Sequence, residues 1–151
     1  MTKFLLAVHV LAAIVAVGPV TVAASLFPPT ARKALAESGE HRSHLGLLHR
    51  ICRVYAVVGV VVPVFGFATA RNMGVLGDTW LVVSIVLTVL AALVLGALVL
   101  PRQEAILEGV DGGTAAGRET VRLAVVTGIF NLLWAAVTVL MIVRPGSTTG
   151  V

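Results

Sequence analysis

The sequence predicts an all-α membrane protein: a transmembrane four-helix bundle with no water-soluble domain of appreciable size. Of its 151 residues, 58% are hydrophobic and only 12% are charged, and the mean hydropathy is +1.04. Soluble domains are about a quarter charged, so this chain lacks the polar surface that water requires. Four apolar runs, each long enough to cross a hydrocarbon core of about 30 Å as a helix, take up most of the chain.

The four predicted spans are residues 4–27, 51–70, 79–100 and 121–143. They contain no Asp, Glu or Lys, and their two arginines, Arg53 and Arg122, each lie near a span end. Lipid offers no partner to backbone N–H and C=O groups, so each run must satisfy its hydrogen bonds internally, as a helix. Residues 1–151 therefore form a single membrane domain, with connecting loops at 28–50 and 101–120.

The distribution of basic residues predicts the orientation. Eight of the eleven lie in or beside the 28–50 and 101–120 loops, whereas Lys3, Arg71 and Arg144 lie on the other side. Short loops rich in Lys and Arg stay in the cytoplasm, so both termini are predicted on the non-cytoplasmic side of the cell membrane, in a multi-pass protein. The net charge of +4 is explained by attraction to the lipid bilayer. Nucleic acid is not an expected partner, because the basic residues flank membrane spans.

The first span also resembles a secretory signal peptide, with Lys3, an apolar stretch and the small residues Ala23, Ala24 and Ser25. Cleavage there would leave three spans. A signal peptide would place the following loop outside, yet that loop and its flanks hold five of the eleven basic residues. Retention of the segment as a helix is therefore favoured.

Prolines open both predicted cytoplasmic loops. Pro28 and Pro29 begin a short interfacial helix that Gly39 is expected to end, and Pro101 begins a second that Gly109 is expected to end. An offset of 71 residues aligns the two helices. A duplicated two-helix unit, as in some transporters, and chance similarity between proline-ended helices both explain this.

His9 is one of the few polar residues inside the predicted spans, about 7 to 8 Å from the outer boundary by helical rise. Imidazole binds haem iron and transition metals, and haem can lie between helices of a bundle. The other histidines fall on the opposite side, which excludes a bis-histidine haem and leaves a five-coordinate haem on His9 as an alternative. We favour a hydrogen bond to a hydroxyl at similar depth; the candidates are Thr69, Ser84 and Thr138.

His41, His44 and His49 form a loose cluster in the first loop. Cys52 could join them as a metal ligand if the second helix begins early. A solvated loop facing lipid headgroups explains the same residues, and we prefer it. The single cysteine rules out an internal disulfide.

Asn131, ten residues into the fourth span, predicts a contact between helices. An amide near the bilayer midplane is costly without a partner. Pro19 and Pro63 lack an N–H and so free the carbonyls of Val15 and Gly59, which also fall near the midplane. We predict that Asn131 donates to one of these carbonyls and fixes the fourth helix against the first or second.

Asp78 and Trp80 mark the start of the third span. Asp is a preferred N-cap residue, and Trp is enriched at the membrane interface. Asp78 is therefore predicted to cap the helix rather than act as a catalytic acid. No catalytic residue is identified, and the spans lack the carboxylate that proton pumps and ion pathways use.

Several short motifs carry a family resemblance that covers most of the chain. They are His9 within residues 5–13, Gly18, Pro63 with Gly66 and Thr69, Trp80, Ser84, and Pro101 with Arg102 and Gln103. The sequence resembles a bacterial family of small predicted integral membrane proteins known by a domain-of-unknown-function label, which implies four helices and no particular activity. It also resembles copper-resistance membrane domains, whose first-helix histidine would correspond to His9. The further metal ligands of such a site are not evident here.

Three functional classes follow. The first is a non-enzymatic membrane component or subunit that packs against other membrane proteins or itself, which the lack of catalytic groups favours. The second is a haem- or metal-binding protein that uses His9. The third is an oligomeric small-molecule permease, to which a two-helix duplication would add support.

Overall fold

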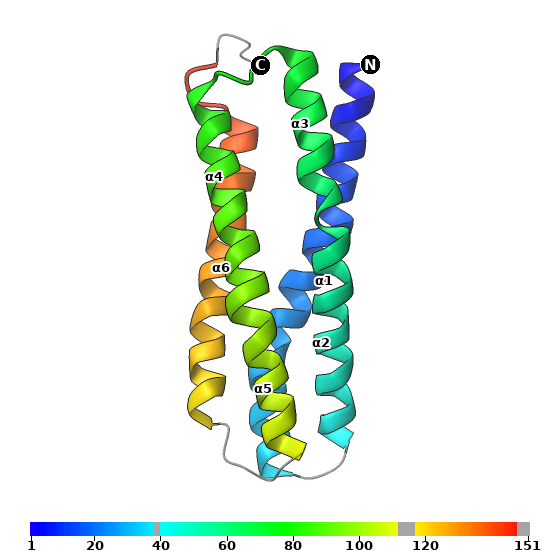
Figure 1. Cartoon of the computed structure of the whole chain (residues 1–151), viewed down its shortest axis with the longest axis vertical. Coiled ribbons are helices and arrows are strands. Elements are labelled where there is room, and N and C mark those ends of the chain that lie inside the picture. Colours follow the sequence, from blue (N-terminus) through cyan, green and yellow to red (C-terminus); the bar gives the residue numbers. More distant parts are fainter. Residues whose placement is uncertain (38–39, 112–116, 148–151) are drawn as a thin grey trace.

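A computed structural model describes residues 1–37, 40–111 and 117–147, and all regular structure in these ranges is helical. The helices form four long rods (Figure 1). The elements are α1 (Thr2–Ala36), α2 (Glu40–Val58), α3 (Val61–Met73), α4 (Thr79–Leu93), the π-helix η1 (Val94–Val99), α5 (Leu100–Asp111) and α6 (Gly117–Val143). The predicted all-α fold is confirmed.

Each rod is long and apolar enough to cross a bilayer. The four candidate spans cover Thr2–Ala36, Glu40–Met73, Thr79–Val110 and Gly117–Val143. At most 22% of the residues in their most apolar stretches are buried inside the protein. Many of the other apolar side chains are exposed, as Leu132 is at 72%. Such a surface suits lipid, because lipid solvates apolar side chains at no cost.

The rods pack side by side. α1 contacts α3 along its first half and α2 along its second half, while α4 and η1 pack against α6 (Figure 1). α6 also contacts α1, which closes the bundle. We call the end with Thr2 and Val143 the terminal end. We call the opposite end, where α5 and α6 approach each other, the arginine-rich end.

The larger core cluster draws on α1, α2, α4, η1, α5 and α6 and includes Phe27, Leu45, Ile106, Leu123 and Phe130. A smaller cluster at the terminal end surrounds Trp80 and Leu81. The bundle is therefore packed most completely toward its arginine-rich end.

The prolines do not end helices where we expected. α1 continues through Pro28 and Pro29 to Ala36, and the helix begun at Thr79 continues through Pro101 to Asp111. Much of the two predicted loops is consequently helical, and Gly109 lies within α5; Gly39 is outside the described residues. Phe27, Pro28 and Ala31 are buried, so packing offsets the hydrogen bonds that proline removes.

The second rod contains a break that we did not predict. α2 ends at Val58 and α3 begins at Val61, with a turn at Gly59 and Val60. Pro63 cannot donate to the carbonyl of Gly59, and that carbonyl instead accepts from the N–H of Val62 at 3.1 Å. The proline therefore tightens the turn before it and separates the rod into two helices. Pro19, by contrast, lies inside an uninterrupted α1.

Candidate functional site

His9 lies between α1 and α3 and is 8% exposed. Its Nδ1 lies 2.9 Å from the carbonyl oxygen of Val62, next to the break in the second rod. Gly66 lies directly beside the ring: a Cβ at this position would be 2.8 Å from His9 Cε1. The glycine thus makes room for the imidazole, and the carbonyl of Val62 fixes its orientation.

The hydroxyls expected to bind His9 do not do so. Thr69, Ser84 and Thr138 each donate to the carbonyl four residues earlier on their own helix, at distances of 2.7, 2.8 and 2.8 Å. Serine and threonine in helices form this local bond readily, which leaves no need for a partner on another helix. The expected hydrogen bonds were therefore wrong, and a backbone carbonyl takes their place.

The bond to Val62 assigns the proton in neutral His9. A carbonyl oxygen only accepts, so Nδ1 must donate and the lone pair lies on Nε2. Metal-binding histidines are often oriented this way. Within residues 1–37, 40–111 and 117–147, however, no group of three or more His, Cys, Asp or Glu side chains could hold a metal ion. What the described geometry provides is a polar link between α1 and α3.

Asn131 joins α6 to α1, but through a different acceptor from the one predicted. Its Nδ2 donates to the hydroxyl oxygen of Ser25 at 3.0 Å rather than to the carbonyl of Val15 or Gly59. Its Oδ1 and the buried Oγ1 of Thr127, one helical turn earlier, have no hydrogen-bond partner. Both residues line a pocket of about 240 Å³ between the two helices.

Disrupting the Asn131–Ser25 pair is expected to loosen α6 from α1. A double-mutant cycle of Asn131→Leu and Ser25→Ala should give a coupling energy of about 0.6 to 1.7 kcal/mol, the range of hydrogen bonds between membrane helices. The measurement is unfolding by SDS in mixed micelles. Thr138→Val, which removes a hydroxyl bonded only within α6, should show no coupling to Ser25→Ala. Strict additivity of the Asn131 and Ser25 changes would contradict the link.

Gln103 is a fully buried polar residue that the sequence analysis did not single out as a site residue. Its side chain spans α5 and α2: Oε1 lies 3.1 Å from Nδ1 of His49, and Nε2 donates to the sulfur of Cys52 at 3.5 Å. Val99, Gln103 and Ile106 are all completely buried and follow the i, i+4, i+7 spacing of one helix face. That spacing could have identified Gln103 from the sequence.

The predicted histidine cluster separates in the structure. His49 contacts Gln103, whereas His41 and His44 contact each other edge to face with ring centroids 6.4 Å apart. All three lie on α2, which begins at Glu40. Cys52 is buried and contacts Gln103 of α5, and among the described residues it forms no group of three or more metal-ligating side chains with His41 and His44. The interfacial interpretation of His41 and His44 therefore fits better than a metal site.

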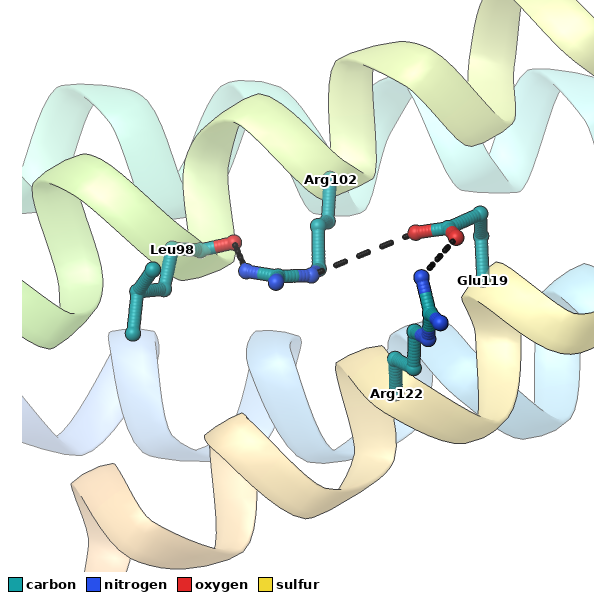
Figure 2. A network of polar contacts seen from close by, with 4 residues as sticks. All are labelled: Leu98, Arg102, Glu119 and Arg122. Atoms are coloured by element: carbon teal, nitrogen blue, oxygen red, sulfur yellow. Dashed lines mark hydrogen bonds and ion pairs between the residues drawn. The ribbon is translucent and has the colours of Figure 1, made fainter.

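A polar network joins α5 and α6 at the arginine-rich end (Figure 2). Glu119 accepts from Nη1 of Arg122 at 3.0 Å and lies 4.0 Å from Nε of Arg102. Arg102 also donates from Nη1 to the carbonyl of Leu98 at 3.0 Å. These side chains are partly exposed, so the network positions the two helix ends at a stabilisation of only about 1 kcal/mol or less per pair.

Trp80 and Asp78 lie at the terminal end. Asp78 occupies the N-cap position of α4, and its carbonyl accepts from the N–H groups of Leu81 and Val82. Its carboxylate accepts from the indole Nε1 of Trp80 at 3.0 Å rather than from a backbone N–H. The guanidinium of Arg144 lies 5.6 Å from the centre of the Trp80 ring, a cation–π distance. This group connects α4 to the end of α6.

Four long apolar helices, joined by polar contacts inside the bundle, define an integral membrane protein of the helical class. Residues 3–145 match the family described as "Predicted integral membrane protein (DUF2269)", and the chain belongs to this family. The resemblance to a family of small predicted integral membrane proteins, noted from the sequence motifs, is thereby confirmed. No curated protein and no solved structure matches the chain.

Proposed function

We propose that the protein is a non-enzymatic component of the cell membrane that acts by packing and binding rather than by chemistry. The observation that carries this proposal is the position of His9. His9, the only histidine in the apolar stretch of the first rod, forms a contact between α1 and α3. Its ring lies against Gly66, and its Nδ1 donates to the backbone carbonyl of Val62. Asn131 is used in the same way between α6 and α1.

The distribution of basic residues supports one orientation of the bundle in the membrane. Eight of the eleven basic residues belong to the arginine-rich end and its connections. By the positive-inside rule this end faces the cytoplasm, and both termini lie outside it. The expected partners are the bilayer itself and apolar helices of other membrane proteins or of a second copy, and nucleic acid is not among them.

An absorption spectrum with elemental analysis tests the proposal. Protein purified in mild detergent is expected to show no Soret band and no metal in stoichiometric amount, because His9 serves the helix contact. His9→Ala should lower the unfolding temperature and leave the spectrum unchanged. A Soret band, or one bound metal per chain, that His9→Ala abolishes would replace this proposal with the haem or metal protein considered from the sequence.

A further inference from the structure

A second pocket, of about 330 Å³, lies between α1 and α2 near the arginine-rich end. Two facing stripes of side chains build it. On α1 the stripe follows i, i+4, i+7 spacing, and on α2 it follows i, i+3, i+6, i+7 spacing, so each stripe occupies one face of its helix. The lining residues are Leu26, Thr30 and Lys33 of α1 and His41, His44, Leu47 and Leu48 of α2.

The two stripes match in polarity because α1 and α2 run in opposite directions (Figure 1). Lys33 comes late in α1, while His41 and His44 come early in α2, so the basic side chains meet near the arginine-rich end. The leucines meet about 10 Å deeper, since seven residues of helix separate Leu26 from Lys33. Thr30 lies between them and donates its hydroxyl proton to the carbonyl of Leu26. The pocket therefore has a basic outer half and an apolar inner half.

The basic half is available to a ligand. Among the described residues, no hydrogen bond or ion pair engages the side chains of Lys33, His41 or His44, and no carboxylate lines the pocket. Glu37 and Glu40 are neighbours in sequence but are not part of the lining. Lys33 supplies a full positive charge, and each imidazole can donate an N–H. Phosphate oxygens are the natural acceptors for such a group of donors.

We propose that this pocket binds one anionic phospholipid, with the phosphate at Lys33, His41 and His44 and an acyl chain along Leu26, Leu47 and Leu48. The order of the lining residues matches the order of groups in such a lipid, from charged headgroup to hydrocarbon. Basic pockets between membrane helices recognise lipid headgroups in this way. A zwitterionic lipid would bring its own cation toward Lys33 and is disfavoured. This inference does not depend on the absence of enzymatic activity.

Native mass spectrometry of the full chain in dodecyl maltoside tests the site. Titration with dioleoylphosphatidylglycerol is expected to saturate one site, and dioleoylphosphatidylcholine should bind at least about fivefold more weakly. Lys33→Gln should weaken phosphatidylglycerol binding about fivefold, the effect of one cation at a lipid surface. Arg50→Gln is the control: it removes the same charge from α2, outside the pocket lining. Its affinity should stay within about twofold of the parent.

Two further measurements distinguish a phospholipid ligand from free phosphate. Leu47→Ser, at an exposed side chain, should weaken binding of the long-chain lipid and leave binding of dihexanoylphosphatidylglycerol unchanged. Inorganic phosphate at millimolar concentration should not displace the bound lipid. Equal losses in Lys33→Gln and Arg50→Gln would reveal non-specific charge attraction and overturn the proposal. Displacement by inorganic phosphate, or equal binding of the two headgroups, would overturn it as well. Unchanged circular dichroism and elution volume establish that each variant is folded.

Discussion

Gly66→Ala is expected to destabilise the protein by about 1–3 kcal/mol, the usual cost of forcing a methyl group into a packed site. The new Cβ would lie 2.8 Å from Cε1 and 3.1 Å from Nδ1 of His9. The ring cannot simply turn away, because its bond to the carbonyl of Val62 fixes it. Either that bond is lost or α1 and α3 move apart. The measurement is thermal unfolding in mild detergent, followed by circular dichroism.

Two controls show whether the effect comes from the His9 contact. In a His9→Ala background, where the ring is absent, Gly66→Ala should cost less than about 0.5 kcal/mol, so the two changes are strongly non-additive. Gly18→Ala adds a methyl group where, apart from its chain neighbours and the backbone of α1 itself, no atom lies within 4 Å. It should be neutral or stabilise by up to about 1 kcal/mol through helix propensity. If Gly66→Ala unfolds at the parent temperature, the close approach of α1 and α3 is incorrect.

Gln103→Ala should destabilise the protein more than Gly66→Ala, lowering the free energy of unfolding by about 2–4 kcal/mol. Gln103 is completely buried, so truncation leaves a cavity between α5 and α2. It also removes the contacts to His49 and to the sulfur of Cys52. SDS-induced unfolding in mixed micelles, monitored by tryptophan fluorescence, measures the loss.

Two control variants, Gln103→Met and Arg102→Ala, provide the comparison for Gln103→Ala. Gln103→Met keeps most of the volume and loses only the polar contacts, so it should cost about 1 kcal/mol. Arg102→Ala alters an adjacent, partly exposed side chain of the same helix and should change stability by less than about 1 kcal/mol. A result in which Gln103→Ala costs no more than Arg102→Ala would show that Gln103 does not bridge the helices.

The fold class was predictable because one physical constraint dominates the sequence. Apolar runs of about twenty residues in lipid have few alternatives to a helix. Helix ends were less predictable, because local signals compete with packing. Pro28 and Pro29 look like a helix start, yet the burial of Phe27 and Ala31 keeps α1 continuous. Pro63 does break a rod, where Gly59 and Val60 form a turn beside it.

The polar contacts were predictable in kind but not in partner. The buried His9 and the half-buried amide of Asn131 each needed a hydrogen-bond partner, and each has one. The partner depends on rotation and height of the helices, which composition does not determine. His9 bonds the carbonyl of Val62, which follows the break at Gly59, and Asn131 bonds the hydroxyl of Ser25 instead of a carbonyl that proline frees.

The π-helical turn η1 determines which residues of α5 point inward. Val94–Val99 directly precedes the helix that contains Pro101, and a π turn holds one residue more than an α-helical turn. Each extra residue rotates everything beyond it by about 100° about the helix axis. Without that offset, the face of α5 now turned toward α2 would point elsewhere, and the amide between His49 and Cys52 would lose both neighbours. The π-helical turn therefore rotates the second part of this continuous rod relative to the first. As a result, α4 packs against α6 and α5 packs against α2.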